Sequence, residues 1–385
     1  MRMKSGWVLL VLAPLLVFLD GCVNSNNITN SGTGFMWVAT QGDQRVTPFT
    51  VNLSTGAVSQ VGSAVATGTA PTAMAITPDA KSLFVANAVD NSVSAYSVNS
   101  DGSLTAQGAA TPTGQLPVAL AVDPSSKFLF VANENSSTIS VFSISGTSLT
   151  QVGLPFPSSL PGDVTGNGPA ALVTSPSGNY LYVANQFTNT LGAFSYDANG
   201  ALTLIAGYAT GNNPSGLAFS RCAGISTATT SCPTSDGNNL FVADSGSNQI
   251  TVFAACIQAS ATCGTPNGTL APVSGSPFGA GVSPVAFMIH PTLNFVYAVN
   301  SKSNQVSQYK YSSATGALTP LSPAAASTGS NPLGGGITSN GAWAFVTNNG
   351  GSTLTAYSVG TGGQLNPAPT ASISLSGQPS AIVIR

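Results

Sequence analysis

The chain has 385 residues and a formal net charge of −2, and only 5% of its residues are charged, against roughly 25% in an average soluble domain. Nine lysines and arginines cannot supply the positive surface that binding to a phosphate backbone requires, which excludes nucleic acid as a partner. The 42 glycines and 25 prolines favour many short strands joined by turns over long helices.

The N-terminal segment is predicted to be an export signal. Arg2 and Lys4 precede an apolar run from Trp7 to Leu19, which is too short to cross about 30 Å of hydrocarbon as a helix. A basic start followed by a short apolar run is typical of a secretory signal peptide. We therefore expect residues 1–21 to be removed on export.

The end of this run resembles the processing box of bacterial lipoproteins, in which a small residue precedes the cysteine that receives the lipid. The residues are Leu19-Asp20-Gly21-Cys22, and Asp20 departs from the usual small or apolar residue. We expect lipidation of Cys22 and a polar tether over 22–33 that is too hydrophilic to fold. The mature protein would then be a membrane-anchored lipoprotein of the cell envelope. A plain signal peptide beside an unmodified cysteine is the alternative.

A four-residue pattern recurs along the rest of the chain and determines the fold prediction. The copies are Trp37–Thr40, Phe84–Asn87, Phe130–Asn133, Tyr182–Asn185, Phe241–Asp244, Tyr297–Asn300 and Phe345–Asn348. They recur roughly every 50 residues, near the period of four-stranded propeller blades. Seven copies predict seven blades in one domain over 34–385.

Each unit is predicted to contain four short antiparallel strands, A to D. In the second unit, strand A is Ala73–Thr77, strand B is Ser82–Asn87, strand C is Ser92–Val98, and strand D begins at Ser103. Each run is bounded by turn residues. A proline precedes strand A in every unit, where it costs no ladder hydrogen bond. These prolines are Pro71, Pro117, Pro169, Pro214, Pro284, Pro332 and Pro379.

The two ends of the repeat array are complementary. Pro379–Ile384 reads as a strand A with nothing after it, whereas the first unit, from Phe35, has strands B to D but no strand A. Pairing the last strand with the first unit would close a ring and remove two open sheet edges. The sequence therefore predicts an all-β, seven-bladed propeller closed by its C-terminal strand.

These residues resemble the YVTN-repeat propellers and the related lactonase-like seven-bladed propellers, which include bacterial 6-phosphogluconolactonase. The resemblance extends from Gly34 to Arg385 and rests on the strand-B pattern. It implies the fold directly, and it implies hydrolysis of a sugar lactone as one candidate activity.

The last residue of each copy is expected to lie where strand B meets the B–C loop. We expect these side chains, together with Lys302, to surround the channel mouth as candidate ligand-binding groups, because the mouth is the concavity that this architecture makes. The alternative is that each side chain only bonds its own turn. The candidates are Asn87, Asn133, Asn185, Asp244, Asn300 and Asn348.

Catalytic side chains are scarce, which leaves enzyme status open and makes a binding or interaction module the first hypothesis. The alternative is a lactonase, for which Glu134 would be the general base and Arg45 the oxyanion stabiliser. The single histidine, His290, is expected in an A–B turn far from the mouth. We expect a monomer that binds a protein or carbohydrate ligand, and the sequence identifies no cofactor.

Four further cysteines are an even number in a compartment where disulfides persist. Local pairing, Cys222 with Cys232 and Cys256 with Cys263, closes the shortest loops and is our prediction. A zinc site needs closely spaced ligands, and one histidine without a C-x-x-C motif does not provide them. We predict no metal site.

Overall fold

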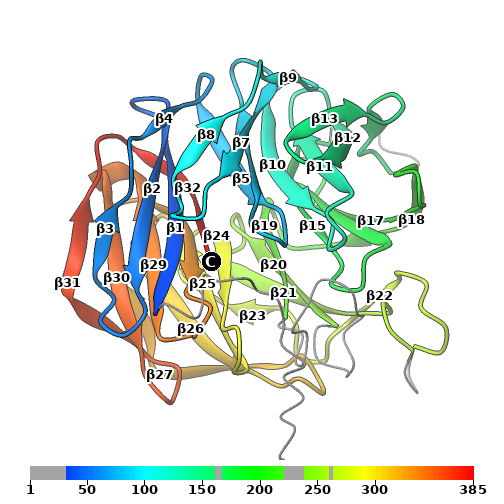
Figure 1. Cartoon of the computed structure of the whole chain (residues 1–385). Coiled ribbons are helices and arrows are strands. Elements are labelled where there is room, and N and C mark those ends of the chain that lie inside the picture. The colour runs from blue at the N-terminus through cyan, green and yellow to red at the C-terminus, as the bar shows by residue number, and fades with distance from the viewer. Residues whose placement is uncertain (1–31, 161–166, 221–237, 260–262) are drawn as a thin grey trace, which may run out of the picture.

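The computed structural model describes residues 32–160, 167–220, 238–259 and 263–385. These residues form seven antiparallel sheets arranged around a central axis (Figure 1). The signal peptide, Cys22 and nearly all of the tether lie outside the described residues, as do Cys222 and Cys232. In the described part of the chain, no helix combines the length and apolar character needed to cross a membrane.

The innermost strand of each blade, strand A, begins at the predicted proline. The ladder shifts register just after this proline, so the missing N–H falls at an irregular position. In blade order these strands are β32 (Pro379–Ile384), β5 (Pro71–Ile76), β10 (Pro117–Val122), β15 (Pro169–Thr174), β19 (Pro214–Phe219), β24 (Pro284–Ile289) and β28 (Pro332–Ile337).

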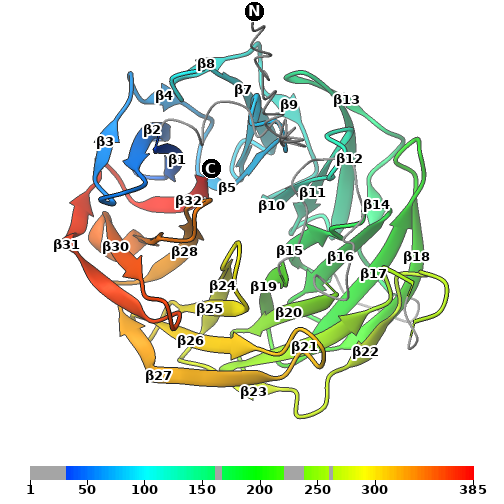
Figure 2. The same cartoon turned by 60° about the horizontal axis from the view of Figure 1, so that its bottom comes forward.

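Strands B and C follow outward from the axis (Figure 2). The B strands are β1 (Thr33–Thr40), β6 (Ser82–Asn87), β11 (Phe128–Asn133), β16 (Tyr180–Asn185), β20 (Asn239–Asp244), β25 (Phe295–Asn300) and β29 (Trp343–Asn348). The C strands are β2 (Arg45–Asn52), β7 (Ser92–Val98), β12 (Thr138–Ser145), β17 (Thr190–Tyr196), β21 (Gln249–Ala255), β26 (Gln305–Tyr311) and β30 (Thr353–Val359).

The outermost strand, D, is continuous in three blades and divided in four. The continuous strands are β18 (Leu202–Ala209), β27 (Leu318–Ser327) and β31 (Leu365–Ser374). The divided strands are β3 (Val58–Gln60) with β4 (Val65–Ala66), β8 (Leu104–Ala106) with β9 (Thr111–Pro112), β13 (Ser148–Gln151) with β14 (Phe156–Pro157), and β22 (Leu270–Pro272) with β23 (Phe278–Gly279). The D strand is paired on one side only, so a break there disrupts a single ladder.

A short 3₁₀ turn, Asn349–Gly351, lies in the B–C connection between β29 and β30.

The ring closes as the sequence predicts. Strand β32 pairs antiparallel with β1, and Val38 faces Ile382 in the register. The first blade is therefore built from both ends of the repeat array, and the C-terminal residue lies near the axis (Figure 2).

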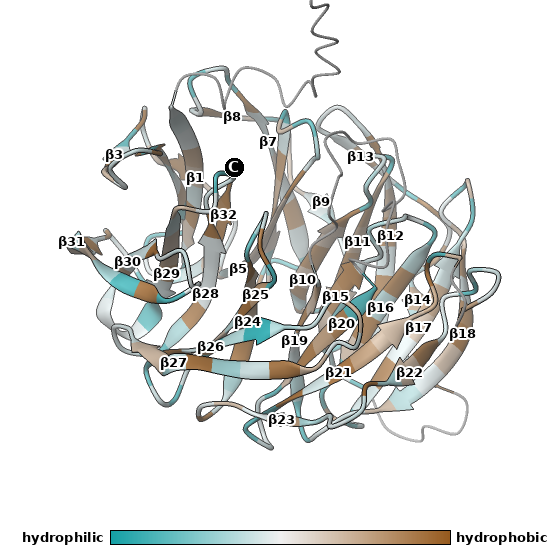
Figure 3. Cartoon of the chain, turned by 90° about the horizontal axis from the view of Figure 1, so that it is seen from below, coloured by the Kyte–Doolittle hydropathy of each residue, from teal (hydrophilic) through white to brown (hydrophobic). Residues whose placement is uncertain are grey.

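The hydrophobic core is divided among the interfaces between neighbouring blades. Side chains of a strand alternate between its two faces, so Phe130 and Ala132 of β11 pack toward blade four whereas Leu129 and Val131 pack toward blade two. Hydrophobic residues lie mainly on the strands, and hydrophilic residues gather in the connections (Figure 3). Because the four strands of each blade are antiparallel, the A–B and C–D connections lie at one end of the ring and the B–C and D–A connections lie at the other.

Candidate functional site

The top face, defined here as the end that carries the B–C and D–A connections, holds most of the predicted site residues. The bottom face carries the A–B and C–D connections. Because every blade presents the same two connections to the top face, equivalent positions can be compared blade by blade.

The six predicted ring residues lie inside the blades and do not surround the mouth. Each is 0% exposed, and in the asparagines the side-chain amide bonds its own blade. Asn87 Nδ2 donates to the hydroxyls of Ser92 and Ser94 on strand C, and its Oδ1 accepts the N–H of Gly68 from the D–A loop. The same amide-to-hydroxyl bonds recur at Asn133, Asn300 and Asn348. The Asn87 amide therefore joins strand B to strand C and to the D–A loop, and the other amides join strand B to strand C. This role differs from both the ligand-binding and the simple turn interpretations.

The loop glycine beside the ring residue explains the close packing. A Cβ atom at Gly68 would lie 2.7 Å from the Asn87 side chain, and one at Gly329 would lie equally close to Asn348. Only glycine leaves room for the ring side chain to pack this closely against the loop.

A second set of asparagines joins neighbouring blades across the top face. Each closes a B–C turn in the left-handed region, with φ between 51° and 58°, and its Oδ1 accepts an N–H from the D–A loop of the next blade at 2.7–2.8 Å. The residues are Asn91, Asn189, Asn248 and Asn304. Asparagine suits the position because it tolerates this conformation and supplies the acceptor.

Replacing Asn248 by alanine should lower the free energy of unfolding by about 2 kcal/mol, because it removes the bond to Ser283 N–H and strains the left-handed backbone. Asn248→Gly is the control, because it relieves the strain and should lose about half as much. Denaturant titration of both variants measures the difference. Equal stability of Asn248→Ala and the parent would contradict this role.

Asp244 differs chemically from the other ring residues. Its Oδ2 accepts a hydrogen bond from Thr251 at 2.6 Å, whereas the asparagines donate from Nδ2 to the equivalent hydroxyl. Its Oδ1 is buried with no partner among the described residues, as are the Oδ1 atoms of Asn133, Asn185, Asn300 and Asn348. Burial raises the pKa of Asp244 to about 6, and hydrogen bonds from Thr251 and Gly211 offset only part of this rise. Blade five therefore contains an uncompensated carboxylate where five other blades contain a neutral amide.

Glu134, the predicted general base, lies in the B–C connection of blade three on the top face. It follows the ring residue of blade three and is partly buried, and burial raises the pKa of its carboxyl group although a hydrogen bond from Gln186 opposes this. Gln186 occupies the same position in blade four, so the two side chains meet across one blade interface. Sequence reasoning missed Gln186, although aligning the repeats would have identified it as the equivalent of Glu134.

The structure does not join Glu134 to Arg45. Arg45 begins strand C of blade one, and its Nη1 donates to the carbonyl of Ala64 at 3.1 Å, beside the outer strand β4. Lys302 is exposed in the B–C turn of blade six, where its N–H donates to the carbonyl of Val282. The predicted base and the two predicted cations thus belong to separate blades.

Exposed apolar side chains are concentrated on the top face. Among the described residues, the large exposed hydrophobic side chains on this face are Val89, Phe187 and Val282. Phe187 is 61% exposed and adjoins Gln186 in the sequence, and its ring covers Gly168. An aromatic ring next to the Glu134–Gln186 pair gives a ligand an apolar surface beside a carboxylate.

His290 lies in the A–B turn of blade six on the bottom face, where the sequence places it. Its Nδ1 accepts the N–H groups of Thr292 and Leu293, and the ring packs edge-on against Phe295. The side chain is 3% exposed. Its described contacts stabilise the turn.

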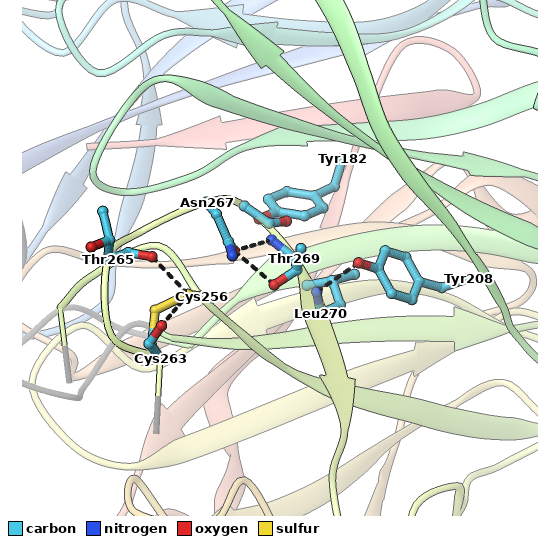
Figure 4. Close-up of a disulfide and its surroundings, with 9 residues drawn as sticks. Tyr182, Tyr208, Cys256, Cys263, Thr265, Asn267, Thr269 and Leu270 are labelled. Carbon is cyan, nitrogen blue, oxygen red and sulfur yellow. Dashed lines mark hydrogen bonds between the residues drawn. A yellow bond between two sulfur atoms is a disulfide. The ribbon is translucent and has the colours of Figure 1, made fainter. Parts of the chain in front are cut away.

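In the structure a disulfide joins Cys256 to Cys263, the pair that the sequence analysis proposes (Figure 4). This disulfide closes part of the C–D connection of blade five on the bottom face. Among the residues the structure describes, no group of three or more histidine, cysteine or acidic side chains could hold a metal ion.

Seven sheets around one axis, closed by β32, define a seven-bladed β-propeller. The family model for lactonase, seven-bladed β-propeller, matches residues 35–156, 156–225 and 226–379. The chain belongs to this family. A search of curated proteins found no match.

Solved structures share the fold at low sequence identity. A candidate 6-phosphogluconolactonase from Bacteroides fragilis has a TM-score of 0.76 and 18% identity, with 93% of this chain and 99% of that chain covered. A second one, from Bacteroides uniformis, has a TM-score of 0.76 and 17% identity, with coverage of 92% and 100%. The periplasmic gluconolactonase of Pseudomonas aeruginosa has a TM-score of 0.72 and 19% identity, with coverage of 91% and 99%.

Proposed function

We propose that the protein hydrolyses a sugar lactone without a phosphate group, with Glu134 on the top face as general base. The observation that carries this proposal is the partly buried carboxyl group of Glu134, whose pKa burial raises toward the range useful for a base. Membership of the lactonase family supports the reaction class.

In the proposed reaction, Glu134 removes a proton from a water molecule that attacks the lactone carbonyl. The ester C–O bond then breaks, and the ring oxygen takes up the proton to give the open hydroxy acid. The Gln186 amide holds the Glu134 carboxylate, and the exposed ring of Phe187 offers its face to the apolar side of a sugar. These three side chains come from two neighbouring blades.

The scarcity of positive charge on the top face favours a neutral substrate. Phosphate recognition normally uses arginine forks or several convergent N–H groups. Arg45 is bonded at the outer strand of blade one, and Lys302 lies in blade six. The named function of the Pseudomonas neighbour, gluconolactonase, agrees with an unphosphorylated lactone. With the predicted signal segment and an anchor at Cys22, we propose that the reaction takes place in the cell envelope.

The test compares hydrolysis of glucono-1,5-lactone and of its 6-phosphate with hydrolysis in buffer alone. We expect the unphosphorylated lactone to be the better substrate, and we expect Glu134→Gln to reduce the rate by about 100-fold or more. Because the pKa of Glu134 is raised, the rate should fall on acidification at a pH above that typical of a glutamate base.

Asp90→Asn is a matched control, since it removes another top-face carboxylate, whose Oδ2 accepts the N–H of Thr69. Its hydrolysis rate should stay near that of the parent. An unchanged rate in Glu134→Gln would refute the assignment of the base.

A binding module without catalysis is the second candidate function. It is favoured by the separation of Arg45 from Glu134, which leaves the proposed base without the cation that sequence analysis paired with it. A protein that does not accelerate hydrolysis of either lactone would support this alternative.

A further inference from the structure

Neighbouring blades share a packing rule on the bottom face. The first residue of the buried six-residue segment in strand B is aromatic in five blades, and its ring covers a glycine in the C–D turn of the next blade. A Cβ atom at any of these glycines would lie within 2.1–2.7 Å of the ring. The pairs are Phe35 with Gly102, Phe128 with Gly200, Tyr180 with Gly268, Phe295 with Gly363, and Trp343 with Gly56.

Two blades depart from this rule, with different consequences. In blade two the residue is Ser82, whose hydroxyl donates to the carbonyl of Gly146 in the next blade at 2.9 Å. In blade five the residue is Asn239, which is 4% exposed and covers Gly316 of blade six. Its Nδ2 donates to the carbonyl of Ser313 at 3.4 Å.

The amide of Asn239 is smaller than an aromatic ring, and a cavity of about 440 Å³ lies beside it. This volume falls within the range of ~300–1,000 Å³ that small-molecule sites occupy. Its polar lining comes from both blades and includes Asn238, Asn239, Asn267, Thr269 and Ser313. The cavity thus occurs at a blade interface where an amide replaces the aromatic ring of the repeat.

The lining suits a neutral ligand with several hydrogen-bonding groups. It contains no charged side chain. The Asn238 Oδ1 atom is buried and has no hydrogen-bond partner among the described residues, a cost that a donor from a ligand would relieve. Alanine side chains and Leu270 provide apolar surface between the polar groups. Amides and hydroxyls beside small apolar patches match the alternating hydroxyl and C–H groups of a saccharide.

The outer wall of the cavity is held from several sides (Figure 4). The disulfide joins Cys256 to Cys263, both of which line the cavity. From blade four, the hydroxyl of Tyr182 donates to the carbonyl of Gly268, and the hydroxyl of Tyr208 accepts the N–H of Leu270, both at 2.9 Å. A wall fixed in this way reduces the ordering cost of binding.

We propose that this cavity, between blades five and six on the bottom face, is a binding site for a neutral mono- or disaccharide. The site lies at the end of the propeller opposite Glu134 and goes beyond the proposed hydrolysis. The Oδ1 atom of Asn238 is unpaired, and the adjacent Asn239 occupies a position that is aromatic in five blades. Departures of this kind from the best packing are expected at functional sites.

The test is titration of the full chain with D-glucose, N-acetyl-D-glucosamine and maltose, followed by calorimetry and by saturation-transfer NMR. We expect saturable binding of at least one sugar with a Kd of about 1 mM or tighter. Asn239→Phe restores the ring of the repeat, fills the cavity and should weaken binding by about tenfold or more, while lactone hydrolysis stays unchanged.

Two further variants keep the outcome interpretable. Asn238→Ala removes the unpaired acceptor with little change in volume and should also weaken binding about tenfold. Glu134→Gln should leave sugar binding intact and reduce only the rate of hydrolysis. The proposal is overturned if none of the three sugars binds saturably, or if a folded Asn239→Phe protein binds them as tightly as the parent.

Discussion

Removing residues 379–385 is expected to abolish cooperative folding of the propeller. Strand β32 is the innermost strand of blade one, and its side chains enter two blade interfaces. Ile382 and Ile384 pack toward blade seven, and Ala381 and Val383 pack toward blade two. Burial of these side chains and their ladder contributes on the order of 5 kcal/mol, which is comparable to the whole stability of many domains.

Loss of this strand also exposes the edge of β1, which is its partner in the ladder. Ser380 Oγ donates to the carbonyl of Pro71, so the strand ties blade one to blade two as well. An open ring with unpaired edges is prone to aggregate. We expect the shortened chain to show a broad unfolding transition at low denaturant and rapid proteolysis.

Ile382→Ala is the milder companion variant. It keeps the ladder with Val38 and should lower the free energy of unfolding by about 1–3 kcal/mol while leaving the transition cooperative. Adding a peptide of residues 379–385 to the shortened chain should restore part of the lost stability. A shortened chain that unfolds at the same denaturant concentration as the parent would show that ring closure does not stabilise the fold.

The fold could be predicted because its information is local and repeated. The strand-B pattern, the proline before strand A and the incomplete units at both ends each appear in the sequence, and closure follows from pairing two incomplete units. The structure matches the predicted β6 and β7 residue for residue. Strand D was less predictable, since a strand with one neighbour tolerates breaks and register shifts that no motif marks.

The strand-B pattern alone could not predict where the side chains of the ring asparagines point. A residue at a strand end can direct its side chain either toward the channel mouth or into the blade. The informative signal was the recurrent hydroxyl residue on strand C, such as Ser94, Ser140, Ser307 and Thr355, because each accepts the amide of a ring residue. The cavity at Asn239 was still less accessible, because the packing rule that it breaks joins residues of adjacent blades.

Asp244→Asn is expected to stabilise the protein above about pH 6. Burial raises the pKa of Asp244 to about 6 from an ordinary value near 3.8, so the folded chain binds a proton that the unfolded chain has already lost between these two values. The stability of the parent therefore falls as pH rises from about 4 to 6, by roughly 3 kcal/mol in total. Asparagine stays neutral, and its amide can donate to Thr251 as in the equivalent blades.

The difference between the two proteins should be small below about pH 4, where the carboxyl group is protonated in both the folded and the unfolded chain, and should reach its full size at pH 7. Denaturant titration from pH 3.5 to 8 measures it. Asn300→Asp in blade six is the reciprocal control, since it introduces a carboxylate at an equally buried position and should destabilise the protein over the same pH range. A pH-independent difference would mean that the amide's hydrogen bonds determine the effect, and that desolvation of the carboxylate does not.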